Sequence, residues 1–400
     1  MSENSKGGSA RNPRKPAVRF LFFIVIFLII TAIYVAFHLF IAWIFIMTFS
    51  LKGDSSSLIY ITSVFIGLFT IIAQIVSHFY HRRPVFPIYL LSSLLIGMTL
   101  YAFLTSLAVG LILIPCHITG IWSNWTYLPY VLRGILAGGI IIPVLAGLVN
   151  ARSLRIRRIE IPMKNLHSEP VKVVFVSDLH LGLLVGRRRL ERIISALMSE
   201  RPDLVLIGGD LYDTRPRNIA QLTEILKRIP IIAPTYAVTG NHEFINGIDE
   251  CVSSMKEIGF NVLRGRAVMD KKTDIQIIGV DDSSGQSPFT STGYSLNKLM
   301  AELDPGKPII FLNHSPLDFL KVRKLGISLE LSGHTHGGQL WPLGYITRLI
   351  YKDGDRGLIT RGSSHLYVST GAGTWGPPLR LGTSSEISIL NLISCKKEKK

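Results

Sequence analysis

Residues 171–182 read VKVVFVSDLHLG and join a short β-branched run to a polar loop. Val171–Ser177 is apolar at nearly every position, which is typical of a strand buried on both faces. Asp178 and His180 follow at its end, and both residue types ligate metal ions. The stretch therefore predicts a buried strand that delivers a carboxylate and an imidazole to one edge of a sheet.

The same arrangement recurs along the second half of the chain. Further strands are predicted at Leu204–Ile207, Thr235–Thr239, Ile309–Leu312 and Ile327–Leu331, followed by GGDLYD, GNHE, NHSP and SGHTHGGQ. Helical spacing of apolar residues occurs at 187–200, 217–229 and 246–258. Alternating strands and helices predict a layered α/β domain, in which loops leaving the carboxyl ends of strands share one crevice. We therefore expect the five polar clusters to meet.

These clusters contain nine side chains suited to metal chemistry: His180, His242, His314, His334 and His336, with Asp178, Asp210, Asp213 and Asn241. Imidazoles and carboxylates without thiolates select divalent ions such as Mn, Fe, Zn or Mg. The three cysteines are scattered along the chain and form neither a thiolate cluster nor a disulfide framework. The donors exceed one tetrahedral site, so the sequence predicts two divalent metal ions, a centre suited to phosphoryl chemistry.

The order D-x-H, GDxxD, GNH, NH and GHxH resembles the calcineurin-like metallophosphoesterase superfamily. The longer strings SDLHLG, GNHE, SGHTHGGQLWP and YVSTGAGTWGPPLRLG are similar to its membrane-associated phosphodiesterase-type branch, which includes transmembrane proteins with a metallophosphoesterase domain. The resemblance covers roughly residues 168–393 and implies a layered αββα sandwich as the catalytic domain, at 171–393.

The resemblance also implies roles for individual residues. One ion would be held by Asp178, His180, Asp210 and His336, and the other by Asp210, Asn241, His314 and His334. A hydroxide bridging the two ions would attack phosphorus. His242 would stabilise the transition state or protonate the leaving oxygen, Asp213 would orient His242, and Glu243 would stand behind the ligands. The alternative for Asp213 is a helix N-cap or turn residue.

Several other residues have a functional and a structural interpretation. Arg187, Arg188 and Arg189 start a predicted helix just after the first ligand loop, where they would contact a polar headgroup or substrate, or form a solvated face. Arg380 resembles a family position near the substrate phosphate, and its alternative is a structural ion pair. His167 and His365 are expected to be structural.

The first half of the chain is of a different kind, because only five residues between Phe20 and Val149 are charged. A helix needs roughly 20 apolar residues to cross a bilayer core about 30 Å thick. Four stretches qualify, at Phe20–Phe49, Leu58–Phe79, Ile88–Cys116 and Tyr127–Val149. They predict an all-α domain of four transmembrane helices at 20–150. A cleaved signal peptide is the alternative for the first stretch, although its apolar core would span only about 7–15 residues.

The distribution of Lys and Arg predicts the orientation. Basic residues gather in the N-terminal segment 1–19, at Arg82 and Arg83, and in the segment 151–170. Because such flanks stay on the inner side, both termini and the second half are predicted to be cytoplasmic. If the fourth stretch did not cross, the second half would face outward. Segment 151–170 is expected to be a juxtamembrane linker attracted to anionic lipid, or an ordinary stop signal. Residues 394–400 are expected to form a basic tail.

These features predict a membrane-anchored dinuclear metallohydrolase that cleaves a phosphoester or pyrophosphate bond, most naturally a phosphodiester. The expected partners are membrane lipids and a phosphoester substrate, and proximity to the bilayer favours a lipid-linked one. One alternative is a soluble phosphodiester. Another is a catalytically silent domain that binds metal or partners while the membrane half signals or transports. No nucleic-acid partner is predicted.

Overall fold

The computed structural model describes residues 14–80, 83–121, 125–166, 170–282, 296–317 and 319–395. The contacts within the chain form two compact units: Met1–Val76 with Met98–Ile140, and Ser77–Gly97 with Ile141–Lys400. The start of the expected N-terminal segment 1–19, His167 and the end of the expected tail 394–400 lie outside the described residues.

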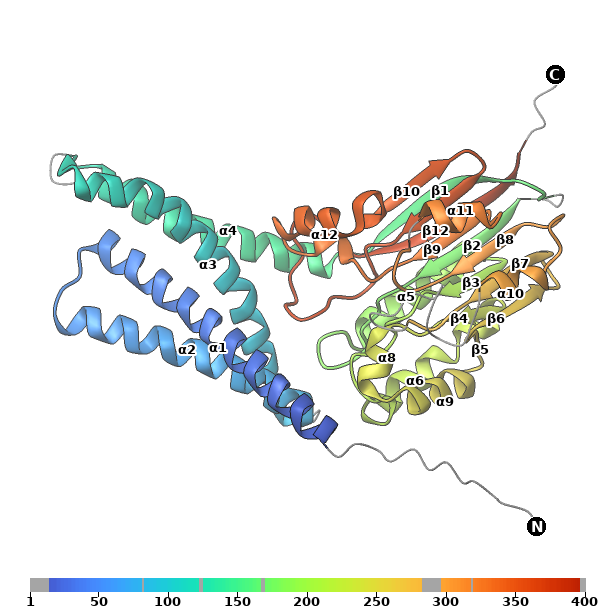
Figure 1. Ribbon diagram of the computed structural model, residues 1–400, viewed down its shortest axis with the longest axis horizontal. Coiled ribbons are helices and arrows are strands. Elements are labelled where there is room, and N and C mark those ends of the chain that lie inside the picture. The colour runs from blue at the N-terminus through green and yellow to red at the C-terminus, as the bar shows by residue number, and fades with distance from the viewer. Residues whose placement is uncertain are drawn as a thin grey trace, which may run out of the picture. The chain divides into compact units, whose positions relative to one another are not determined.

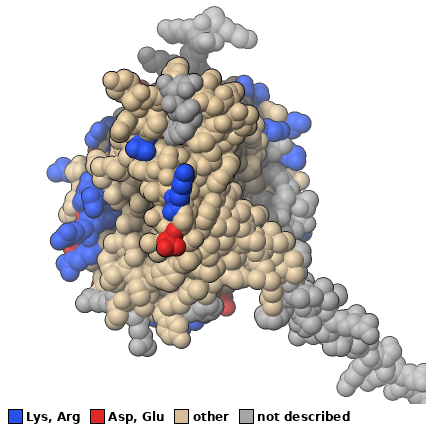
Figure 2. Space-filling model, turned by 90° about the vertical axis from the view of Figure 1, so that its left-hand side faces the viewer, with Lys and Arg blue, Asp and Glu red and all other residues tan. Residues whose placement is uncertain are grey.

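Four long helices make up the first part of the chain (Figure 1). They are α1 (Arg14–Phe49), α2 (Asp54–Phe79), α3 (Phe86–Ile118) and α4 (Leu128–Arg152), with the short 3₁₀ turn η1 (Arg83–Val85) before α3. Each is long and apolar enough to cross a membrane, which confirms the four predicted segments. In the middle of the view in Figure 2, uncharged residues cover most of the surface, while Lys and Arg gather toward the edges.

Arg133 in α4 is the one charged residue inside the predicted fourth stretch. Its Nε donates to the carbonyl oxygen of Thr48, 3.2 Å away, in the last turn of α1. Its guanidinium also lies 5.0 Å from the ring centroid of Phe49 and 5.4 Å from that of Tyr130. A helix leaves its last carbonyls without intrahelical partners, so Arg133 serves as a cap for α1.

The rest of the chain contains two six-stranded sheets. The first has the order β1-β12-β2-β3-β4-β5, with β1 (Arg155–Met163), β2 (Val171–Val176), β3 (Leu204–Ile207), β4 (Thr235–Ala237), β5 (Asn261–Val262) and β12 (Glu386–Ser394). Strands β2, β3, β4 and β5 are parallel, whereas β12 is antiparallel to β2. The predicted strands at 171, 204 and 235 are confirmed.

The second sheet has the order β10-β11-β9-β8-β7-β6. Its strands are β6 (Arg266–Asp270), β7 (Ile275–Gly279), β8 (Ile309–Leu312), β9 (Leu329–Ser332), β10 (Gly357–Arg361) and β11 (Ser364–Val368). Strands β7, β8, β9 and β11 run parallel to one another, so the carboxyl ends of β8 and β9 lie at the same edge, whereas the outer strands β6 and β10 are antiparallel to β7 and β11. The predicted strands at 309 and 327 are confirmed.

Helices cover the outer face of each sheet (Figure 1). The helices on the first sheet are α5 (Arg187–Glu200), α6 (Ala220–Leu226), α7 (Ile229–Ile232), α8 (Asn241–Asn246) and α9 (Ile248–Ile258), with the 3₁₀ turn η3 (Pro216–Ile219). Those on the second are α10 (Leu296–Ala301) and α11 (Phe319–Lys324). The elements η4 (His336–Gly338), α12 (Leu343–Tyr351) and η5 (Lys352–Asp355) follow β9.

Three apolar cores hold these layers together. One lies between the sheets and joins Phe175 and Leu206 of the first sheet to Ile277 and Leu331 of the second. Another packs α5, α6 and α9 against the first sheet, and the third packs α10 and α11 against the second. Nearly continuous apolar strands such as β2 and β8 are buried on both faces, as their sequence predicts. The predicted αββα sandwich is confirmed.

The segment at 151–170 is not a simple linker. Arg155–Met163 forms β1, which pairs in parallel with β12 along its whole length. Ile161 and Met163 are fully buried, while the arginines before them are exposed. The sequence analysis missed this strand because its basic residues suggested a membrane flank, although apolar side chains recur at every second position near its end.

Candidate metal centre

The predicted site residues of the first sheet stand at three neighbouring strand ends. Asp178 and His180 follow β2, Asp210 and Asp213 follow β3, and Asn241 and His242 open α8 after β4. Because β2, β3 and β4 are parallel, these loops leave the same edge of the sheet.

The second sheet contributes three imidazoles at its own strand ends. His314 lies two residues beyond β8, and His334 and His336 follow β9. The Gly333 amide donates to the His314 carbonyl, which ties these two loops to each other. All nine predicted side chains therefore come from loops at corresponding strand ends.

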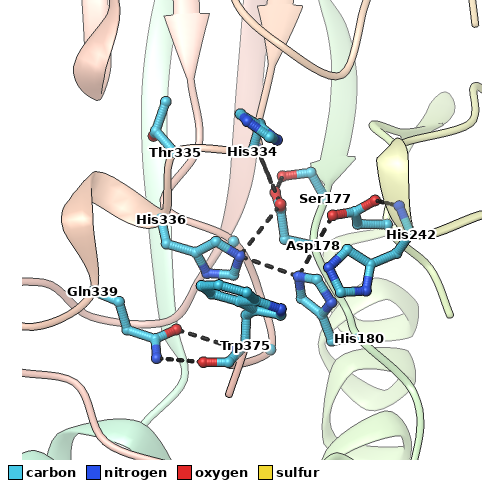
Figure 3. A network of polar contacts seen from close by, with 12 residues as sticks. Ser177, Asp178, His180, His242, His334, Thr335, His336, Gln339 and Trp375 are labelled. Carbon is cyan, nitrogen blue, oxygen red and sulfur yellow. Dashed lines mark hydrogen bonds and ion pairs between the residues drawn. The ribbon is translucent and has the colours of Figure 1, made fainter. Parts of the chain in front are cut away.

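Asp178, His180 and His336 form one half of the centre (Figure 3). The Nε2 atoms of His180 and His336 are 3.1 Å apart. The same Nε2 of His336 is 3.5 Å from Asp178 Oδ1. One ligand atom from each of the three residues lies within 4.8 Å of the others, which is close enough for them to share one ion.

Asp210, Asn241, His314 and His334 form the other half. His314 Nε2 is 3.2 Å from Asp210 Oδ2. His334 Nδ1 is 3.0 Å from Asn241 Oδ1 and 3.2 Å from His314 Nε2. Asp210 Oδ2 also lies 3.7 Å from His180 Nε2 in the first half. The Asp210 carboxylate thus lies between the two groups, as a bridging ligand would.

The character of these donors fits divalent cations. Carboxylate oxygens and imidazole nitrogens converge, and His180 Nδ1 is buried without a hydrogen-bond partner. Five predicted ligands have backbone in the left-handed region, with φ between 48° and 67°: Asp178, His180, Asp210, His334 and His336. Such strain costs of order 1–3 kcal/mol per residue and is concentrated at functional sites. The loops are therefore shaped for ligand geometry rather than for local stability.

Two glycines let the loops approach one another closely. A methyl group at Gly240 would overlap the Asp210 carboxylate, and one at Gly333 would overlap Asp178 and Ser177. Because glycine has no side chain, the GNH and GHxH loops can pack directly against the ligands of the first sheet.

The electrostatics of the centre favour positive charge beside Asp210. Burial lowers the pKa of His314, but the Asp210 carboxylate raises it more strongly, so this pKa lies well above its ordinary value. Burial raises the pKa of Asp210, yet the neighbouring imidazoles, His314 first, bring it below its usual range. The pKa of His336 is depressed by burial and by Arg380, which keeps the ring neutral, as a metal ligand requires.

His242 and Asp213 form a pair at the edge of the cluster. His242 Nδ1 is 3.1 Å from Asp213 Oδ1, and the side chain of His242 is 12% exposed. Burial lowers the pKa of His242, but the hydrogen bond with Asp213 raises it above its usual value. Asp213 Oδ1 is also 3.6 Å from His180 Nδ1, so this carboxylate contacts a predicted ligand as well. The arrangement fits a proton donor held in place by a carboxylate.

Glu243 is fully buried behind the ligand loops. Its Oε2 accepts hydrogen bonds from the amides of Asp210 and Gly240, and its Oε1 accepts one from Tyr212. Burial, together with the Asp210 charge, raises the pKa of Glu243 to about 7. Glu243 therefore joins the GNH loop to the loop that carries Asp210, which agrees with its expected position behind the ligands.

The two arginines predicted as substrate contacts lie in different surroundings. Arg380 is fully buried, donates to the carbonyl of Gly373 at 2.7 Å, and places Nη2 3.0 Å from His336 Nδ1. Arg380 therefore contacts a predicted ligand, and its expected contact with substrate stays a prediction. Arg187 is exposed on α5 and pairs with Glu191 at 2.7 Å. No contact between described residues joins Arg187 to the cluster.

Sequence reasoning missed three residues beside the centre. Ser177 donates to Asp178 Oδ2 over 2.5 Å. The Gln339 side chain bonds both the amide and the carbonyl of Trp375, at 3.0 and 2.8 Å, and the Trp375 ring lies 6.3 Å from that of His242. Figure 3 shows this pair beside the histidines. Gln339 and Trp375 stand inside the two longest family-like strings, which was the available signal.

Known proteins share this domain. A calcineurin-like phosphoesterase family model matches residues 171–338. An uncharacterized metallophosphoesterase of Aquifex aeolicus is 33% identical over 60% of this chain and 92% of its own length. A transmembrane protein with metallophosphoesterase domain of Danio rerio is 34% identical over 63% of this chain and 61% of its own. Phosphodiesterase YaeI of Escherichia coli is 28% identical over 57% and 84%.

The layered fold and the clustered histidine and aspartate side chains define a metallophosphoesterase domain, here joined to four helices that are long and apolar enough to cross a membrane. The chain belongs to the calcineurin-like metallophosphoesterase family.

Proposed function

We propose that this protein is a membrane-anchored phosphodiesterase with a dinuclear metal centre in its catalytic domain. The observation that carries the proposal is the convergence of two ligand groups on Asp210, whose Oδ2 is 3.2 Å from His314 and 3.7 Å from His180. In this assignment Asp178, His180, Asp210 and His336 hold one ion. Asp210, Asn241, His314 and His334 hold the other.

The bound ions would polarise the phosphoryl group and lower the pKa of an attacking water. The chain's own residues supply the remaining steps. His242 donates a proton to the leaving oxygen. Asp213 accepts a hydrogen bond from Nδ1 of His242 and keeps the proton on that atom in place, so that Nε2 of His242 is the donating atom. The short Nδ1–Oδ1 distance and the raised pKa of His242 support these roles.

We further propose that the substrate is a lipid-linked phosphoester and that the catalytic domain lies on the cytoplasmic side. Four membrane-crossing helices hold the domain beside a bilayer, which favours a substrate that resides there. The basic residues on either side of the helices support the orientation. A reporter fused after Lys400 tests it, because a reporter found on the outside would contradict a cytoplasmic domain.

The decisive experiment compares the full chain with Asp210→Asn and with Asp249→Asn, a matched change at an exposed position of α9. Purified proteins are analysed for bound metal and for hydrolysis of bis-p-nitrophenyl phosphate. We expect the parent and Asp249→Asn to bind two ions and to be active. Asp210→Asn should lose metal and about 10³-fold in rate, equivalent to about 4 kcal/mol. A metal-free parent, or equal rates in Asp210→Asn, would refute the assignment.

A further inference from the structure

Helix α12 exposes an apolar face that no described part of the chain covers. None of its residues is buried. The most exposed are Tyr345, Ile346, Leu349 and Ile350, which recur at helical spacing and lie on one side. A helix in a globular domain normally turns its apolar stripe inward. We call α12 together with Trp341 and Trp375, which are 53% and 56% exposed, the apolar rim.

The apolar rim is held rigidly in the fold. Gly338 approaches Gly344 so closely that a side chain at position 338 would overlap the α12 backbone. The Trp341 amide donates to the Leu381 carbonyl at 2.8 Å. Gln339 holds both backbone groups of Trp375. The exposed side chains therefore stand on a fixed support and are not part of a loose loop.

The apolar rim borders the metal centre at two points. Tyr351, at the end of α12, has its ring centroid 6.0 Å from that of His334, a predicted ligand. The Trp375 ring lies 6.3 Å from that of His242, the predicted proton donor. A phosphoester at the centre would therefore have apolar surface on two sides.

Basic residues accompany the apolar rim. Arg348 and Lys352 are exposed on and directly after α12. Gly373 and Thr374, which directly precede Trp375 in the chain, line a hollow of about 740 Å³ whose wall includes Arg152, Arg187, Arg188, Arg189 and Arg192. Positive charge beside exposed apolar and aromatic side chains is the composition that binds the interface of an anionic membrane.

The chain connects this face to the end of α4, because residues 141–152 of this helix belong to the same compact unit. Only Ser153 and Leu154 separate the end of α4 from the start of β1. The Arg380 amide donates to the carbonyl of Gly147 in α4 at 2.9 Å, and the next residue, Leu381, pairs with Leu340 just before α12. The apolar rim thus starts beside the residues that contact α4.

We propose that the apolar rim inserts into the interface of the bilayer that α4 crosses. A lipid-anchored substrate would then present its phosphoester between α12 and Trp375 while its acyl chains stay in the membrane. This second statement rests on the proposed phosphodiesterase function, whereas insertion itself does not.

Insertion is tested by fluorescence quenching on the full chain in vesicles of phosphatidylcholine and phosphatidylglycerol. Cys116 and Cys395 are replaced by alanine, and the fully buried Cys251 is kept. Leu349→Cys carries an environment-sensitive fluorophore. The matched control is Ile231→Cys, because Ile231 is 83% exposed and Leu349 is 81% exposed. The protein with alanine at positions 116 and 395 and no introduced cysteine is labelled in parallel, and its signal corrects for labelling of Cys251.

We expect the label at 349 to be quenched by lipids with a doxyl group on the acyl chain and shielded from aqueous iodide. The label at 231 should show the opposite. Quenching of both labels by iodide alone would refute insertion. Shielding at 349 without lipid quenching would also refute it, since protein would then cover α12, either a second copy or another part of the chain.

The functional part is tested with two substrates and Leu349→Glu/Ile350→Glu. One substrate is bis-p-nitrophenyl phosphate in solution, and the other is a p-nitrophenyl phosphatidyl ester in the same vesicles. The ratio of lipid-ester to soluble-ester rates should fall about tenfold in this variant, corresponding to about 1.4 kcal/mol. It should stay constant in Ile231→Glu. An unchanged ratio would refute the role in substrate access. Absence of both activities in the parent would refute the proposed function and leave the quenching result valid.

Discussion

Polar side chains have different surroundings in the membrane helices and in the ligand loops. In the helices, Thr48 and Thr70 donate to the carbonyls four residues earlier, at 2.7 Å in each case, so each hydroxyl is satisfied locally. In the ligand loops, buried imidazoles and carboxylates face one another, and five of them sit on left-handed backbone. The hydrogen bonds in the helices suit a stable structure in lipid. In the loops, strained backbone is the cost of holding imidazoles and carboxylates close together. Substitutions in the two regions should therefore have different consequences.

The largest effect is expected for His242→Ala, which removes the proposed proton donor from the ligand loops. Loss of a general acid lowers kcat by about 10²–10⁴-fold. Metal content and the thermal unfolding temperature should change little, because His242 is partly exposed at the edge of the cluster. Turnover of bis-p-nitrophenyl phosphate, metal analysis and thermal unfolding of the full chain measure these three quantities.

His365→Ala is the matched control for this change. His365 is buried in β11 and contacts Thr360 Oγ1 and the Pro162 carbonyl, each at 2.9 Å. Its loss should lower the free energy of unfolding by about 1–3 kcal/mol, because it leaves buried partners unsatisfied, and should spare kcat. If His365→Ala instead abolished turnover while His242→Ala did not, the proposed division between catalytic and structural histidines would be wrong.

A second prediction concerns a buried carboxyl group outside the cluster. Burial raises the pKa of Glu330 in β9 from its ordinary value of 4.5 to about 7. A raised pKa means that the folded state prefers the protonated form, so stability is lost as pH rises from about 4.5 to about 7. Glu330→Gln removes this titration while keeping an acceptor for the Leu317 amide. At pH 8 the variant should be more stable by about 3 kcal/mol, since each pKa unit corresponds to about 1.4 kcal/mol.

Thermal or denaturant unfolding of parent and variant from pH 5 to pH 8 measures this effect as the difference in free energy of unfolding between the two proteins. The difference should be smallest at pH 5 and grow with pH. A difference independent of pH would show that Glu330 does not titrate in this range in the folded protein.

Arg380 provides a further test in the ligand loops, since it is a buried cation that contacts the predicted ligand His336. Arg380→Met keeps an unbranched stem in the buried site but removes the guanidinium, and with it the contact with His336 Nδ1. Loss of a group that orients a metal ligand typically costs 10–100-fold in metal affinity or activity. We expect weaker metal binding in a competition titration with a chelator, and partial recovery of turnover at high metal concentration. Unaltered affinity would mean that Arg380 only fills space.

The sequence predicted the helices and strands that are determined by residues close to one another in the chain. The four membrane helices follow from apolar length alone, and β2, β3 and β8 follow from short β-branched runs. The ligands could be named because each one stands directly after such a strand. Their convergence depends on parallel order within each sheet, which the alternation of strands and helices along the chain predicted.

What the sequence did not reveal depends on contacts between distant segments. Strand β1 was hidden because its pairing with β12 joins residues more than two hundred positions apart. Arg380 was predicted to lie near substrate, whereas its contacts with the carbonyls of Gly371 and Gly373 and with His336 are ones that no local pattern indicates. The support that Gln339 gives to Trp375 is of the same kind.

The smallest effect is expected for Arg133→Met in the membrane helices. The change removes the hydrogen bond to the Thr48 carbonyl and the contacts with Phe49 and Tyr130. Interhelical polar contacts in membranes contribute on average about 0.6 kcal/mol, so the unfolding temperature in detergent should fall only slightly. Metal content and turnover of a soluble ester should match the parent, because this arginine satisfies a helix end and no ligand. Loss of bound metal in Arg133→Met would mean that the helices and the ligand loops are coupled, and the contrast between a stable anchor and a strained centre would have to be abandoned.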